Sequence, residues 1–104
     1  SRIEDVSGRF PQVSGLKVTY DPKAEPGSRV VEAMVGDSAV DPAATYKLAT
    51  NDFMANGGDG YAMFKGAPRI IDAVGGKLMA AQVMEYIEAA GTVSPTVEGR
   101  IVGR

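Results

Sequence analysis

The residues best suited to chemistry lie in one stretch, ATNDFMANGGDGYAMF, which runs from Ala49 to Phe64. Its sixteen residues include three glycines, two carboxylates, two asparagines and three aromatic rings. A glycine-rich loop of this kind can cradle a phosphate, hold a calcium ion, or form a turn that needs positive φ angles. The three alternatives require different spacings, so the sequence distinguishes between them.

Spacing argues against a phosphate cradle and against a calcium loop. Gly58 and Gly60 are followed by a glycine only at Gly66, which does not match the dinucleotide-binding motif, and the Lys-Ser/Thr pair of the Walker motif is absent. A calcium loop that began at Asp52 would need a glutamate at its twelfth position, where Met63 stands. We therefore expect neither kind of site.

Two interpretations of the stretch remain open from the residues alone. In the first, the glycines at positions 57, 58 and 60 permit a tight irregular turn whose amides are capped by Asp59. In the second, the loop exposes Phe53 and Tyr61 beside the Asp59 carboxylate, which can accept two hydrogen bonds at once. Such a loop suits a ligand with an aromatic face and vicinal hydroxyls, and a nucleoside has both features.

The composition excludes several kinds of active site and partner. The chain has 104 residues, a formal net charge of -2 and no basic stripe, so nucleic acids and anionic membranes are not expected partners. It contains no histidine and no cysteine, which removes the usual general base, the thiolate nucleophile and the commonest transition-metal ligands. We expect no catalytic residue, metal site or cofactor in this chain. No apolar run approaches the roughly 20 residues of a membrane-spanning helix, so no membrane insertion is expected.

Strand-like segments precede the glycine-rich stretch and must position it. Leu16–Tyr20 alternates apolar and polar residues, which predicts a strand with one buried face. The run RVVEAMV predicts a second strand with Val31, Ala33 and Val35 on one face, and the turn-rich DPKAEPGS between the two predicts a hairpin. YKLAT, residues 46–50, is a short β-favouring run, so the glycine-rich stretch is expected at the end of a strand.

One helix is predicted after the glycine-rich stretch. From Lys77 to Ala90 the apolar residues recur with the helical period, and Gly91 stands where a C-terminal cap belongs. We interpret the apolar stripe of this helix as core packing. The closing PTVEGRIVGR predicts a final short strand. A chain of this length is expected to form one domain at most.

Four segments, SGRFPQVSGLKVTYD, PGSRV, YKLATNDFMANGGDGY and VEGRI, resemble the C-terminal domain of the 5'-nucleotidase family in order and spacing. This family also contains UDP-sugar hydrolases, 2',3'-cyclic nucleotide phosphodiesterases and NAD nucleotidases. The resemblance covers nearly the whole chain. It implies an α+β fold, part of a layered α/β/β/α domain to which the predicted hairpins and main helix would belong. It also implies a location in the periplasm, outside the cell or at the cell surface.

The resemblance also implies roles for named residues. In this family an N-terminal metallophosphoesterase domain holds two divalent metal ions, and the C-terminal domain binds the nucleoside part of the substrate. Phe53 would then be one of two phenylalanines that stack on the base, and Asp59 the carboxylate that binds the ribose hydroxyls. Asn51, Gly57 and Gly58 would mainly shape the loop. These are substrate-binding roles, and none is catalytic.

The sequence departs from the family because the metal domain, the linking helix, the upstream phenylalanine and the substrate-binding arginines are not in it. We therefore expect residues 1–104 to be the C-terminal portion of such a domain, paired with the absent N-terminal domain or with a second copy of the chain. The full-length parent is expected to be a phosphoesterase that hydrolyses nucleotides. The alternative is a non-catalytic nucleoside-binding or architectural module. Which nucleotide it takes stays open.

Overall fold

The computed structural model describes Ile3 and residues 7–104. Its strands are β1 (Leu16–Tyr20), β2 (Val30–Val35), β3 (Ser38–Ala39) and β4 (Ile101–Gly103). Its helices are α1 (Asp52–Ala55), the 3-10 helices η1 (Gly58–Gly60) and η2 (Ala62–Phe64), and α2 (Met79–Ala90). The chain forms two compact units, one made of Ser1–Lys47 with Val97–Arg104 and the other of Leu48–Thr96.

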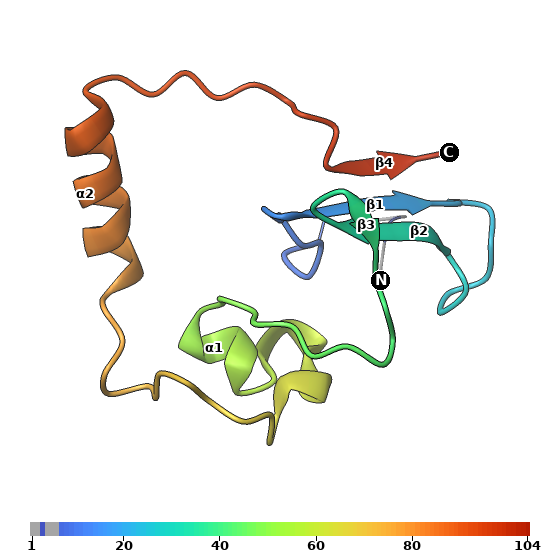
Figure 1. Cartoon of the computed structure of the whole chain (residues 1–104), viewed down its shortest axis with the longest axis horizontal. Helices are drawn as coiled ribbons and strands as arrows, with labels where there is room; N and C mark the ends of the chain where they lie inside the picture. Colours follow the sequence, from blue (N-terminus) through green and yellow to red (C-terminus); the bar gives the residue numbers. More distant parts are fainter. Residues whose placement is uncertain (1–2, 4–6) are drawn as a thin grey trace. The chain divides into compact units, whose positions relative to one another are not determined.

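The first unit is built on a mixed four-stranded sheet with the order β3-β2-β1-β4 (Figure 1). β2 pairs antiparallel with both β1 and β3, which makes two consecutive hairpins, and β4 pairs parallel with β1. The predicted hairpin of the first two strands and the predicted final strand are therefore confirmed. A sheet and one main helix agree with the α+β class expected from the sequence.

A β-bulge changes which residues of β2 share a face with β1. Val18 pairs with Ala33 and Thr19 with Glu32, but Tyr20 pairs with Val30 because the register shifts between Thr19 and Tyr20. Directly opposite residues of an antiparallel pair point to the same side of a sheet, and the extra residue of a bulge is left unpaired. The predicted alternation of Val31, Ala33 and Val35 is therefore interrupted by the bulge, where Val31 is the extra residue and Val30 stands opposite Tyr20.

The predicted strand at residues 46–50 is also absent from the structure. None of these five residues is in a strand, and none pairs with another segment in the described sheet. Instead the Tyr46 hydroxyl accepts a hydrogen bond of 2.9 Å from the backbone N–H of Asp41, across a turn. The β preference of a short run depends on an available partner strand, which YKLAT lacks here. The chain therefore enters the glycine-rich stretch from an irregular segment.

The main helix, α2, agrees with the sequence prediction in position and cap. It begins two residues after the predicted start at Lys77, and it ends at Ala90, where Gly91 adopts a φ of 77° and donates its N–H to Ile87 O. The prediction that its apolar stripe is core packing is wrong for the described residues, since Met79, Val83 and Ile87 are exposed. Within residues 48–96 no other helix or strand packs closely against α2, so nothing covers the stripe there.

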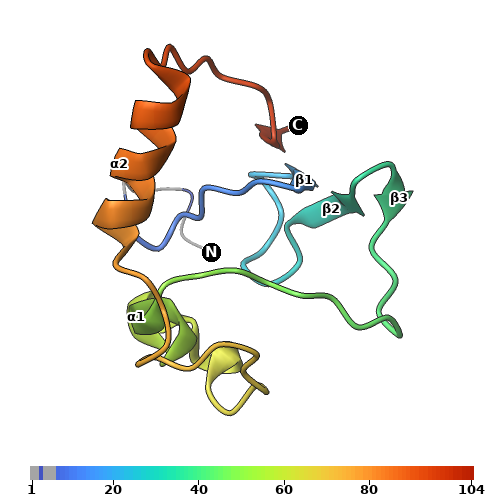
Figure 2. The same cartoon turned by 60° about the vertical axis from the view of Figure 1, so that its left-hand side comes forward.

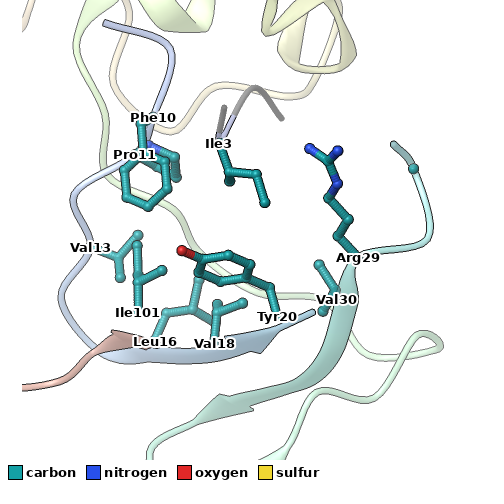
Figure 3. A pocket seen from close by; sticks show the side chains of 11 residues that line it. Ile3, Phe10, Pro11, Val13, Leu16, Val18, Tyr20, Arg29, Val30 and Ile101 are labelled. Atoms are coloured by element: carbon teal, nitrogen blue, oxygen red, sulfur yellow. The ribbon is translucent and has the colours of Figure 1, made fainter. Parts of the chain in front are cut away.

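A hollow of about 250 Å³ lies on one face of the sheet unit (Figure 3). Its lining is mostly apolar, with one guanidinium: Ile3, Phe10, Pro11, Val13, Leu16, Val18, Tyr20, Gly27, Arg29, Val30 and Ile101. Among the described residues no hydrophobic side chain is buried, and only Arg29, at 8% exposure, falls in the buried class. The sheet unit therefore keeps an open apolar face. No helix among the described residues is long and apolar enough to cross a membrane.

Candidate functional site

The glycine-rich stretch folds into three short helical segments within the second unit. α1 is followed at once by the segment that contains η1 and η2 (Figure 2). Backbone hydrogen bonds connect Tyr61 N–H to Gly58 O and Phe64 N–H to Tyr61 O. All five residues predicted to bind substrate lie in this one segment. None of them lines the hollow on the sheet unit. The candidate site is thus a local structure, built by about ten consecutive residues.

Asn51 begins this structure by capping α1. Its φ and ψ of -77° and 165° are extended, and its Oδ1 accepts a 2.8 Å hydrogen bond from Met54 N–H. An asparagine side chain at this position satisfies one of the N–H groups that a helix leaves free at its start. The structure therefore gives Asn51 the loop-shaping geometry that was expected of it, through a helix cap that the sequence analysis had not identified.

The chain reverses after α1 through a left-handed glycine. Gly57 has a φ of 93°, and its N–H donates to Met54 O at 2.9 Å. A side chain at this φ is strained, and a Cβ there would also lie 3.4 Å from Ala62 Cα. Gly57 is therefore required by its backbone conformation.

Gly58 is required for a different reason, because its φ is not positive. A Cβ at position 58 would lie 2.5 Å from Phe53 Cε1 and 2.6 Å from Phe53 Cδ1 and Cζ. Real Cβ atoms do not come this close to other carbons, so only glycine lets the ring lie on this part of the backbone. The expected requirement for a positive φ at Gly58 is replaced by a requirement for space beside Phe53.

Phe53 and Asp59 are both exposed to solvent. The Phe53 side chain is 57% exposed although one part of its ring lies against Gly58. Asp59 has a φ of 53°, the one positive value at a described residue other than glycine. Aspartate tolerates this conformation better than most residues, at a cost of about 1 kcal/mol or more.

The carboxylate of Asp59 does not cap the turn. No hydrogen bond or ion pair to the Asp59 side chain is present among the described residues. The interpretation in which Asp59 caps the amides of the turn is therefore wrong; the Tyr61 N–H of this turn donates to Gly58 O instead. Both oxygens of Asp59 remain available to accept hydrogen bonds from a ligand.

Two further features of this unit were missed in the sequence analysis. The rings of Tyr61 and Phe64 stack with their centroids 5.5 Å apart and their planes at 12°, a spacing of three residues that fits one turn of a 3-10 helix. Arg69 Nη2 donates to Ala55 O at 3.2 Å and to Asn56 Oδ1 at 2.6 Å. No sequence signal links Arg69 to residues 13 and 14 positions earlier, whereas the three-residue aromatic spacing was visible.

The described residues do not form a metal centre. No group of three or more His, Cys, Asp or Glu side chains comes together in Ile3 and residues 7–104. Two of the nearby carboxylates bind backbone amides instead: Asp52 Oδ1 accepts from Phe53 N–H, and Asp72 Oδ1 accepts from Val74 and Gly75 N–H. The arrangement offers an exposed ring and a free carboxylate, which are means of binding.

Comparison with known proteins identifies the relatives of this chain. A model of the family described as "5'-nucleotidase, C-terminal domain" matches residues 3–66. Snake venom 5'-nucleotidase of Gloydius brevicauda is 41% identical over 103 aligned positions, and the match covers 91% of this chain and 17% of that protein. The trifunctional nucleotide phosphoesterase protein YfkN of Bacillus subtilis (strain 168) is 39% identical over 107 aligned positions, and the match covers 97% of this chain and 7% of that protein.

A solved structure shares the fold. The crystal structure of the 5'-nucleotidase precursor from Thermus thermophilus matches with a TM-score of 0.82 and 39% identity, over 94% of this chain and 20% of that one. The predicted α+β class and the predicted family resemblance are confirmed by these matches. The chain spans only 17% and 7% of the length of the two curated relatives above.

Proposed function

The chain belongs to the 5'-nucleotidase C-terminal domain family, and from this premise we propose that it forms the nucleotide-binding part of a 5'-nucleotidase-like phosphoesterase. Phe53 stacks on the base of the nucleotide, and Asp59 accepts hydrogen bonds from the ribose hydroxyls. Asn51, Gly57 and Gly58 hold the loop in shape. Residues 1–104 are then a C-terminal portion of the binding domain of a longer enzyme.

One observation supports this proposal above the others: an exposed aromatic ring and a free carboxylate stand on the same short, capped loop. Phe53 is 57% exposed and rests on Gly58, and Asp59 follows Gly58 directly. Exposing a ring to water is unfavourable, and stacking a base on it gains roughly 1 to 3 kcal/mol without selecting one base over another. A carboxylate with both oxygens free matches the two neighbouring hydroxyls of ribose.

Hydrolysis in the proposed enzyme takes place outside this chain. Two divalent metal ions held in a separate N-terminal domain would supply its chemistry, namely activation of water and polarisation of the phosphate. The residues of this chain bind the nucleoside and orient the phosphoester toward that domain, which converts binding energy into correct positioning. Phe53 and Asp59 therefore act on substrate affinity, and the chain by itself is not a catalyst.

The proposal also covers the partner and the location of the protein. The open hollow on the sheet unit and the exposed stripe of α2 support a covering partner, either the N-terminal domain or a second copy of the chain. We place the protein in the periplasm, outside the cell or at the cell surface, as is usual in the family.

A non-catalytic role is the second candidate function. The absence of histidine and cysteine from the sequence favours it, because this chain alone lacks the common metal ligands and general bases. In that case the chain is a nucleoside-binding module, or an architectural domain whose loop binds nothing.

The test compares two substrates in the full-length protein, adenosine 5'-monophosphate and ribose 5-phosphate, which lacks the base. We expect Phe53→Ala to raise KM for the nucleotide by roughly 5- to 150-fold, the range that corresponds to the stacking energy, and to leave KM for ribose 5-phosphate unchanged. Leu48→Ala, another exposed apolar residue of the same unit, is the matched control. Equal losses on both substrates refute the stacking role, and an inactive protein that still binds adenosine favours the non-catalytic module.

A further inference from the structure

Arg69 joins the two ends of the loop that carries the proposed nucleoside site. Its Nη2 donates to Ala55 O at 3.2 Å and to Asn56 Oδ1 at 2.6 Å, across 14 and 13 positions of the chain. We propose that Arg69 is a positioning residue, which sets the geometry of Phe53 and Asp59 without touching the ligand. This inference rests on the proposed function, since it assigns a residue to that same site.

α1 is too short to be stable by itself. It has four residues, whereas isolated helices shorter than about 12 residues are marginal in water. Its start is fixed by the Asn51 side chain, and its end is fixed by Arg69, which binds the carbonyl of the last helical residue, Ala55, and the side chain of the cap, Asn56. A cation at this end also complements the partial negative charge of the helix carbonyls.

Arg69 closes a loop that contains η1 and η2. The backbone hydrogen bonds inside it are local: Gly57 N–H to Met54 O, Tyr61 N–H to Gly58 O and Lys65 N–H to Ala62 O each span three residues. Such bonds shape single turns but do not set the angle between one turn and the next. The two bonds of Arg69 span the whole segment, so they restrict how the turns of η1 and η2 stand relative to α1.

The restraint from Arg69 acts on the two proposed binding residues, Phe53 and Asp59. Phe53 lies in α1, two positions before Ala55, and its ring lies against the backbone of Gly58. Asp59 follows Gly58 directly and is held at a φ of 53°. A rotation of the chain at Asn56 would move Gly58 and Asp59 away from the ring together. Arg69 restrains the chain at Asn56 through two hydrogen bonds, one to the preceding carbonyl, Ala55 O, and one to the Asn56 side chain.

A guanidinium suits this task because one nitrogen can donate two hydrogen bonds in a fixed plane. Arg69 is exposed, so its loss opens no cavity and leaves no buried group unsatisfied. We therefore expect its removal to change the order of the loop more than the stability of the protein. The same exposure means that Arg69→Ala is a clean substitution for a test.

The experiment measures hydrolysis of adenosine 5'-monophosphate by the full-length protein with Arg69→Ala. We expect KM to rise about 5- to 10-fold while kcat stays within about twofold and Tm is unchanged, because ground-state and transition-state binding weaken together. Lys77→Ala is the matched control, since it removes another exposed cation of the same unit, one that pairs with Glu85 on α2. If Arg69→Ala does not fold, Asn56→Ala removes the 2.6 Å acceptor alone and is expected to raise KM in the same direction.

A double-mutant cycle separates positioning from other effects. Because Arg69 is proposed to position Phe53 as well as Asp59, Arg69→Ala should raise KM by a smaller factor in a Phe53→Ala background than in the wild-type background, since the part of its effect that passes through the ring is gone. An effect that is equally large in both backgrounds, or no effect of Arg69→Ala in the wild-type background, overturns the inference. A normal KM for Phe53→Ala overturns the proposed function itself, and the positioning role with it.

Discussion

The ring of Phe53 lies against the backbone of Gly58 so closely that a Cβ at position 58 would come within 2.5 Å of Cε1. The rest of the ring remains in solvent, since Phe53 is 57% exposed. The contact explains the second glycine of the GGDG sequence by space, where the first, Gly57, is explained by its φ of 93°. Glycine is therefore required at these two neighbouring positions for two different physical reasons.

Gly58→Ala is expected to displace the Phe53 ring and to weaken nucleotide binding. The new methyl group would overlap three ring carbons, but the ring is half in solvent and can rotate away, so the cost in unfolding free energy stays below about 1.5 kcal/mol. KM for adenosine 5'-monophosphate rises, while KM for ribose 5-phosphate does not. Gly76→Ala is the control, since a Cβ there makes only an ordinary contact of 3.7 Å. An unchanged nucleotide KM in Gly58→Ala contradicts the proposed role of the contact.

Asp59→Asn is expected to discriminate between ribose and 2'-deoxyribose. Asparagine tolerates the φ of 53° as aspartate does, so the backbone is retained and only the charged acceptor is lost. Hydrogen bonds to a charged acceptor contribute about 1.5 to 3 kcal/mol, and the 2'-deoxynucleotide has one hydroxyl fewer to lose. KM for adenosine 5'-monophosphate should therefore rise more than KM for its 2'-deoxy analogue. Asp37→Asn, in the turn between β2 and β3, controls for net charge, and equal effects on both nucleotides would leave Asp59 with a turn role only.

Asn51→Ala is expected to loosen the loop by removing the cap of α1. The 2.8 Å bond from Met54 N–H to Asn51 Oδ1 is lost, at a cost of about 0.5 to 2 kcal/mol. Asn51→Asp keeps the acceptor and should behave like the wild-type protein. Amide hydrogen exchange of residues 53–58 measures the effect directly, since the amides of an uncapped four-residue helix exchange faster. Equal exchange in the alanine and aspartate variants would show that the cap does not stabilise α1.

Arg29→Ala is expected to destabilise the hairpin of the sheet unit. Arg29 is 8% exposed, lines the hollow, and donates its Nε to Ala24 O at 2.8 Å across the β1–β2 connection. Loss of a buried charged donor leaves this carbonyl without that partner and costs about 1 to 3 kcal/mol. Urea unfolding measures the difference, with Lys23→Ala on the same connection as the control. A midpoint shift no larger than that of Lys23→Ala would contradict a structural role for Arg29.

Local features of the fold could be predicted from the sequence because their causes are local. The alternation of Leu16–Tyr20 predicted β1, and the helical period with Gly91 at its end predicted α2 and its cap. The cap of α1 had a visible signal as well, since asparagine at the start of a helix is a common N-cap, whereas Asp59 was the only capping side chain considered in this stretch from the sequence. The family could be recognised because its motif is long and contiguous.

Other features depended on which residues the folded chain brings together. YKLAT has the composition of a strand but finds no partner strand in the described part of the chain, and composition alone does not supply one. The stripe of α2 has the pattern of a core helix, but its side chains are exposed within residues 48–96. Periodicity indicates which face is apolar, and it does not indicate what covers that face.

The sequence by itself determined the family, the α+β class, the location of the candidate site in residues 49–64, and the absence of histidine and cysteine chemistry. Only the tertiary structure decided that Val30 stands opposite Tyr20, that Gly58 makes room for Phe53, and that Arg69 closes the loop at Asn56. These three relationships join residues that are not sequence neighbours, and they depend on a register shift, a ring orientation or a hydrogen bond across a loop. Their energies arise only after the backbone has brought both partners together, so no local pattern encodes them.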